Sequence, residues 1–75
     1  MPRVRSLRPR EMIRALERAG FQVSRQRGSH AILLREGMPR PISVPVHPGH
    51  LKRGLQERIM RQAGLTADDL IALLD

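Results

Sequence analysis

Apolar residues recur at helical spacing in two separate stretches of the chain. The first stretch begins near Pro9, which suits the first turn of a helix, and stops at Gly20; its apolar positions are Met12, Ile13, Leu16 and Ala19. The second stretch stops at Gly64, and its apolar face consists of Leu51, Leu55, Ile59 and Ala63. A recurrence every three or four residues predicts an amphipathic helix in each stretch.

Between these helices, apolar and polar residues alternate as they do in strands. Strands are expected over residues 21–24, 30–35 and 42–46, with a turn at 27–29 and a hairpin connection at 36–39. Pro45 has no N–H to donate, so the third strand should lie at a sheet edge or end at Pro45. In the second strand, His30, Ile32 and Leu34 share one face, and Ala31, Leu33 and Arg35 share the other.

A short third helix is expected after Gly64. Thr66 and Asp69 have the spacing of a capping box, with Asp in place of Glu, and Leu65 and Leu70 occupy the positions of a hydrophobic staple. This helix should reach about Leu74. The full order of a helix, antiparallel strands, a helix and a short helix predicts an α+β class.

The chain has 75 residues, enough for a single small domain over residues 1–75, with a flexible basic arm over residues 1–7. It contains one Phe and no Tyr or Trp, so Leu, Ile, Val and Met must supply nearly all of the core. A single core of this size rarely contributes more than about 3–5 kcal/mol. A protein partner or self-association would therefore add to the stability of the folded domain.

The composition argues against secreted and membrane-spanning proteins. Because there is no Cys, disulfides and thiolate metal sites are impossible, which fits a reducing cytoplasm, where we expect the protein. No apolar run approaches the ~20 residues that a membrane span requires, so no membrane partner is expected. The N-terminal residues have no apolar stretch behind them and are not expected to form a secretory signal.

Positive charge is concentrated before residue 62. The formal net charge is +7. All 14 Lys and Arg residues and four of the seven acidic residues lie at or before Arg61, so residues 1–61 have a net charge of +10. Residues 62–75 have a net charge of −3, from Asp68, Asp69 and Asp75. Such a field attracts polyanions, with RNA or DNA ahead of acidic lipid or an acidic protein.

The strongest chemical signal is the block Arg25-Gln26-Arg27-Gly28-Ser29-His30. Arg25 and Arg27 are candidate phosphate ligands, because a guanidinium binds phosphate through two parallel hydrogen bonds; a solvated strand end is the equal alternative. Gly28 allows a turn or a close backbone approach, and Ser29 has the hydroxyl to bind phosphate or orient His30. An imidazole takes and gives protons near neutral pH, so His30 is the candidate catalytic residue.

Five motifs, in one order and spacing, resemble the HicA family of mRNA interferase toxins. They are Gly20-Phe21, the block ending at His30, Val44-Pro45-Val46-His47, Leu51-Lys52-Arg53-Gly54 and Arg61-Gln62-Ala63-Gly64-Leu65. The resemblance runs from about Leu7 to Leu74. It implies the α-β-β-β-α fold of double-stranded-RNA-binding domains with a short C-terminal helix, and the toxin half of a type II toxin–antitoxin pair.

The resemblance also implies an activity and a set of residues. The activity is mRNA cleavage without a metal or other cofactor, with His30 as the catalytic residue and a HicB-type antitoxin as the silencing partner. DNA would be met only indirectly, through the antitoxin complex. His47 matches a family position and is a candidate for substrate contact or for bracing its loop. Lys52, Arg53 and Arg58 open the second helix, whose basic residues reach phosphates in double-stranded-RNA-binding domains; an exposed basic helix face is the alternative.

Three alternatives remain open from the residues alone. His47 and His50 would need a third ligand to hold a metal, and the sequence offers no obvious one. A non-catalytic RNA-binding module would use the same fold, with His30 satisfying a backbone carbonyl. Residues 58–74 resemble a helix-turn-helix, but the second helix has Asp68 and Asp69, which repel DNA phosphates.

The chain departs from the family at Gly54-Leu55-Gln56, where the family usually has Gly-Thr-Leu. This departure predicts a rotated or remodelled apolar stripe on the second helix. The strand after His30 also contains no aromatic residue, which disfavours base stacking beside it.

Overall fold

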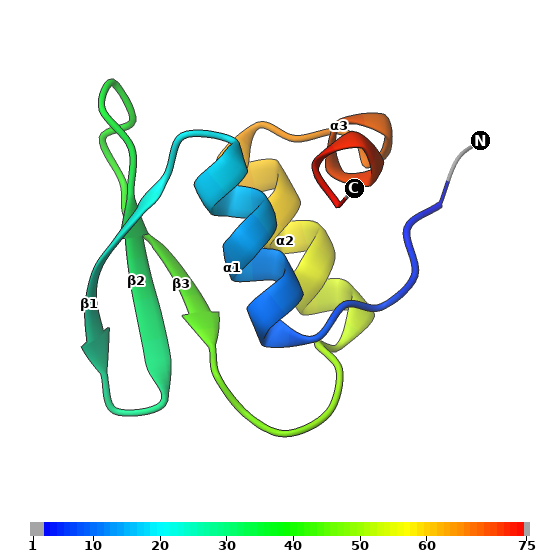
Figure 1. Ribbon diagram of the computed structural model, residues 1–75, viewed down its shortest axis with the longest axis horizontal. Helices are drawn as coiled ribbons and strands as arrows, with labels where there is room; N and C mark the ends of the chain where they lie inside the picture. Colours follow the sequence, from blue (N-terminus) through cyan, green and yellow to red (C-terminus); the bar gives the residue numbers. More distant parts are fainter. Residues whose placement is uncertain (1–2, 75) are drawn as a thin grey trace.

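The computed structural model describes residues 3–74. Along the chain these residues form α1 (Pro9–Arg18), β1 (Gln22–Arg27), β2 (His30–Leu34), β3 (Ile42–Pro45), α2 (Arg53–Ala63) and α3 (Ala67–Leu73). The predicted order of elements is confirmed, and with it the α+β class and the α-β-β-β-α layout followed by a short helix. The helices lie to one side of the sheet (Figure 1).

The strands form an antiparallel sheet in the order β1-β2-β3. Paired residues of β2 and β3 make its inner face, which is buried beneath the helices: Ala31, Leu33, Ile42 and Val44. His30 and Ile32 pair with Pro45 and Ser43 on the outer face. The predicted alternation of β2 is therefore confirmed, as is the position of β3 at an edge with Pro45 at its end.

A β-bulge at Ser24 reverses the alternation of β1. Val23 pairs with Leu33 of the inner face, whereas Arg25, two residues later, pairs with Ile32 of the outer face. In a regular strand, residues two apart point to the same side. The extra residue at the bulge therefore puts Val23 and Arg25 on opposite faces of the sheet.

Beyond β2, Arg35 folds back onto the core instead of continuing the strand. Its guanidinium carbon lies 4.6 Å from the centre of the Phe21 ring, which is the chain's one aromatic residue and is fully buried. The same guanidinium donates to the Ala19 carbonyl at 3.0 Å, just beyond the end of α1. This cation–π and hydrogen-bond pair closes the connection between α1 and β1.

Residues 3–7 pack against the helices, in contrast to the flexible arm predicted over residues 1–7. Val4 and Leu7 are buried. The Leu51 N–H donates to the Leu7 carbonyl at 2.7 Å, and Arg53 Nη1 donates to the Val4 carbonyl at 3.1 Å. Buried apolar side chains and bonded carbonyls explain the order of this segment; residues 1–2 lie outside the described residues.

The side chain of Gln56 fastens this N-terminal segment to α2. It is 1% exposed, and its Oε1 accepts from the Leu7 N–H while its Nε2 donates to the Arg5 carbonyl, both at 2.8 Å. On α2 the buried positions are Gln56, Ile59 and Ala63, whereas Leu55, predicted for the core face, is only half-buried. The departure at Gly54-Leu55-Gln56 thus changes the stripe at one position, where Gln56 is buried in place of Leu55 and its amide pairs with the packed segment.

Replacing Gln56 by Leu should destabilise the fold by about 1–3 kcal/mol, because the Leu7 N–H and the Arg5 carbonyl would be buried without partners. Urea unfolding of the two proteins measures this difference. Gln62→Leu, at an exposed position of the same helix, is the matched control and should change stability by less than about 0.5 kcal/mol. Equal stability of the two variants would contradict the role of Gln56.

Glu11 joins the N-terminal segment to the first turn of α1. Its carboxylate accepts from both Arg5 guanidinium nitrogens, at 3.0 and 2.6 Å, and from the Arg8 N–H at 2.9 Å. The Arg5 hydrogen bond and then the Arg8 backbone hydrogen bond lower the pKa of Glu11 to about 2. A carboxylate with a depressed pKa stabilises the fold above its ordinary pKa, and this contribution disappears as the pH falls toward about 2.

The stabilising effect of Glu11 should therefore be present at pH 6 and absent at pH 2. The pair is partly exposed, so we expect Glu11→Gln to cost no more than about 1 kcal/mol at pH 6. Unfolding free energies of wild type and variant, measured from pH 6 to pH 2, should converge as the pH falls. Glu17→Gln, exposed on the same helix, controls for the general effect of acid. A difference that stays constant over this range would refute the pairing.

Candidate active site at His30

A two-residue turn brings His30 to the start of β2. Arg27 and His30 are paired across the strands, so Gly28 and Ser29 alone form the loop between them. Gly28 has a φ of +59°, and no residue other than glycine has a positive φ within the described range. A positive φ at the first loop position is typical of the type II′ hairpin turn, which favours glycine there. The glycine in the Arg-Gly-Ser-His block thus has a backbone role.

The register of the hairpin places both arginines of the block on the face of His30. Arg27 lies directly opposite His30, and Arg25 lies opposite Ile32, two residues further along the same outer face. All four of these side chains are exposed or half-buried. The two-residue turn sets this register, and the bulge at Ser24 changes only the pairing of the residues before Arg25. Two guanidiniums and an imidazole therefore share one solvent-facing surface.

His30 also lines a concavity of ≈ 440 Å³ between the edge of the sheet and the start of α2. The other lining residues are Ser43, Pro45, His47, Lys52, Leu55 and Arg58. Lys52, Leu55 and Arg58 are spaced three residues apart, so they form one stripe along α2. The concavity therefore combines an imidazole from the sheet with cationic groups from the helix.

His47 is held next to this turn by the backbone. The Val46 N–H donates to the Ser29 carbonyl at 2.6 Å, which continues the pairing of the β3 edge up to the hairpin loop. Nδ1 of His47 lies 2.8 Å from the Pro48 carbonyl oxygen. Because a carbonyl only accepts, Nδ1 is the donor, and the neutral ring keeps its lone pair on Nε2. His47 thus reaches the concavity of His30 with one nitrogen able to accept a proton.

The structure separates two neighbouring residues that the sequence treats alike. Lys52 lines the concavity, whereas the guanidinium of Arg53 is turned away from it and donates to the Val4 carbonyl. Arg58, which the sequence grouped with Lys52 and Arg53 on the second helix, also lines the concavity. Ser43 lines it too and was not among the predicted residues; only its pairing with Ile32 places it there.

The predicted pair His47 and His50 does not assemble into a larger donor set. Within residues 3–74, no group of three or more His, Cys, Asp or Glu side chains comes close enough to hold a metal ion. His50 is exposed and is not among the residues that line the concavity. It lies instead near Glu11, whose pKa it helps to lower.

Comparison with known families decides the class of this domain. The model of a family described as "HicA toxin of bacterial toxin-antitoxin" matches residues 9–65, which span α1, the sheet and α2. The chain belongs to the HicA toxin family. Among curated proteins, none matches the sequence.

Membership makes this HicA protein the toxin of a toxin–antitoxin system and implies an antitoxin as its partner. The matched residues include every side chain around His30 described above. The helix-turn-helix alternative gains nothing from the structure, because α3 has acidic residues in its first turn and Asp69 is engaged there with Thr66. No helix among the described residues is long and apolar enough to cross a membrane.

The turn at Gly28 should be intolerant of a side chain for reasons of backbone conformation alone. Gly28→Ala meets no atom within 4 Å but forces an L-residue to a φ of +59°, which should cost about 1–3 kcal/mol. Gly54→Ala, in the first turn of α2, also meets no atom and has an ordinary φ, so it should stabilise by about 0.5–1 kcal/mol. Opposite signs in thermal unfolding are expected, and a neutral Gly28→Ala would contradict the proposed turn.

Proposed function

We propose that this HicA toxin is a ribonuclease that cleaves mRNA, with His30 as a general acid or base, and that a cognate HicB-type antitoxin silences it. The observation that supports the proposal most is the position of His30 between two sets of cations. Arg25 and Arg27 lie beside it on the sheet, and Lys52 and Arg58 line its concavity. A proton-transfer group flanked by phosphate-binding groups suits the cleavage of a phosphodiester.

RNA provides its own nucleophile for this reaction. A base removes the proton of the 2′-OH, the 2′-oxygen bonds to the adjacent phosphorus, and the bond from phosphorus to the 5′-oxygen breaks. An acid then protonates the leaving 5′-oxygen, so the products are a 2′,3′-cyclic phosphate and a 5′-hydroxyl. The protein must supply the two proton transfers and stabilise the negative charge that develops on the phosphate.

The two histidines of the concavity can share these proton transfers. One residue cannot easily act as base and acid at once, and His47 is the second imidazole that lines this concavity. The hydrogen bond from its Nδ1 to the Pro48 carbonyl leaves Nε2 as the acceptor, which suits a base. His30 would then be the acid that protonates the 5′-oxygen.

His30→Ala should lower the rate of RNA cleavage by about 10²–10⁴-fold and relieve growth inhibition, since general acid–base catalysis has this magnitude. Cleavage of a labelled RNA by purified wild type and variant measures the effect, with and without EDTA. His50→Ala, an exposed histidine outside the concavity, is the matched control and should retain wild-type activity.

The same experiment tests the non-catalytic alternative. If His30→Ala binds RNA as wild type does and wild type shows no cleavage, the domain is an RNA-binding module and His30 has no catalytic role. If EDTA abolishes cleavage by the wild type, the protein is still a ribonuclease, but the metal-independent mechanism through two histidines is wrong.

Lys52 and Arg53 offer a second contrast, because they are adjacent and both basic but face different ways. Lys52→Gln should weaken RNA binding at all sequences and reduce the salt dependence by about 0.7 in log–log slope, as expected for one lost phosphate contact on a single strand. Arg53→Gln should leave that slope unchanged. Affinities measured by fluorescence anisotropy at several salt concentrations separate the two, and equal slopes would contradict the proposed surface.

A further inference from the structure

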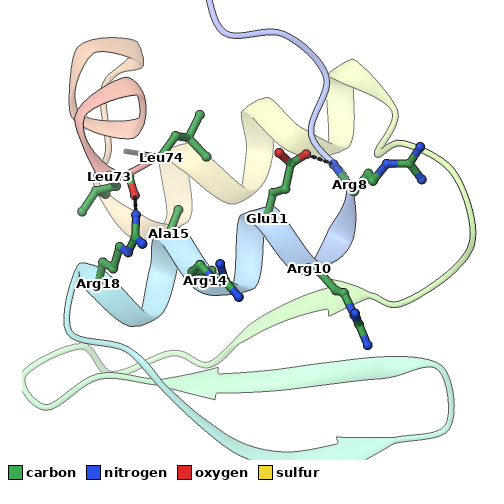
Figure 2. A pocket seen from close by; sticks show the side chains of 8 residues that line it. All are labelled: Arg8, Arg10, Glu11, Arg14, Ala15, Arg18, Leu73 and Leu74. Atoms are coloured by element: carbon green, nitrogen blue, oxygen red, sulfur yellow. Dashed lines mark hydrogen bonds between the residues drawn. The ribbon is translucent and has the colours of Figure 1, made fainter.

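A second concavity of ≈ 380 Å³ lies between α1 and α3 and shares no residue with the concavity of His30. We call it the α1–α3 groove; it is lined by Arg8, Arg10, Glu11, Arg14, Ala15, Arg18, Leu73 and Leu74. Figure 2 shows Ala15 and Leu74 at the space between the two helices, with the arginines spread along α1. The groove therefore has an apolar floor and a cationic rim.

The charges on the rim differ in what they already bind. Arg18 donates to the Leu73 carbonyl at 2.7 Å and so joins α1 to the end of α3 (Figure 2). Glu11 is engaged with Arg5 and the Arg8 N–H. By contrast, Arg10 and Arg14 have no hydrogen-bond or ion-pair partner among residues 3–74. They lie four residues apart, so their side chains are neighbours on one face of α1.

This arrangement fits an acidic polypeptide better than RNA. A sugar–phosphate backbone would satisfy the arginines but would find no partner in Ala15, Leu73 and Leu74, which are buried or half-buried aliphatic groups. A protein segment supplies both requirements, because carboxylates can pair with the rim while aliphatic side chains cover the floor.

We propose that the α1–α3 groove binds an acidic, amphipathic segment of the antitoxin. The inference rests on membership of a toxin–antitoxin family and not on the proposed ribonuclease activity. Carboxylates of the segment pair with Arg10 and Arg14, and its apolar side chains pack on the half-buried Leu73 and Leu74. Because no lining residue belongs to the His30 concavity, this contact holds the antitoxin to the toxin without itself covering His30.

The test compares two double variants with the same loss of charge. Arg10→Gln with Arg14→Gln removes the rim, and Arg40→Gln with Arg61→Gln removes two exposed arginines outside both concavities. Binding of the purified cognate antitoxin is measured by titration calorimetry, and binding of a single-stranded RNA oligonucleotide by anisotropy. We expect the rim variant to weaken antitoxin binding by about tenfold or more and the control pair by much less. Thermal unfolding of both variants checks that the fold is intact.

Three outcomes would overturn the inference. Equal weakening in both double variants would mean that only net charge matters. If the rim variant loses RNA binding but keeps antitoxin binding, the groove binds RNA. If the rim variant binds both as wild type does, the groove does not bind the antitoxin. A selective loss of antitoxin binding supports the inference even if wild type fails to cleave RNA, so the failure of the proposed function is recognised separately.

Discussion

The register of the β1–β2 hairpin is the constraint on which the site depends. Ala31 and Leu33 are buried under the helices, and their burial fixes which face of β2 points outward. The two-residue turn at Gly28 then fixes the register of β1 and places Arg25 opposite Ile32 on the outer face, while the bulge at Ser24 brings Val23 opposite Leu33. A slip of one residue would exchange the faces and bury the wrong side chains. Residues with no chemical role thus determine where His30 and its arginines lie.

The order of elements could be predicted because helix and strand periods are local properties of the sequence. The two faces of β2 follow from the same period and were predicted correctly. The bulge could not be predicted, because in a simple alternation Val23 and Arg25 would lie on the same face of the sheet. Only their pairing with Leu33 and Ile32 shows that they lie on opposite faces. A bulge is a property of two strands together, and the pattern of one strand does not contain it.

The second helix shows a similar limit. Leu55 and Gln56 both fit the helical period set by Ile59 and Ala63, and hydrophobicity alone favours Leu55. The structure buries Gln56 because its amide pairs with backbone groups of Arg5 and Leu7, about 50 residues earlier in the chain. That requirement is non-local, so the sequence indicated neither the packed N-terminal segment nor the buried amide.

The start of α2 also shows why only part of the candidate site could be predicted. Lys52 is the extended N-cap residue and Arg53 the first helical residue, and only Lys52 lines the concavity while Arg53 donates to the Val4 carbonyl. The block from Arg25 to His30 was identified because its residue types are typical of phosphate binding and proton transfer. Lys52 and Arg58 were identified as basic residues of the second helix, whereas Ser43 joins the site only through the pairing of β3, which composition does not reveal.

The arginines behind the net charge of +7 have different uses. Arg18, Arg35 and Arg53 donate to backbone carbonyls, and Arg5 pairs with Glu11, so these guanidiniums stabilise the fold. Most of the other cations fall into two sets, one around His30 and one along α1, while Arg40 and Arg61 lie outside both concavities. The molecule measures 33 × 30 × 21 Å, so each of its dimensions is several times the screening length of about 8 Å at physiological salt. An anion bound to one set therefore lowers the potential at the other only slightly, and by linkage the effect is mutual. Strong antagonism between RNA and a partner at the α1–α3 groove would consequently require the partner to reach His30 with a different part of its chain.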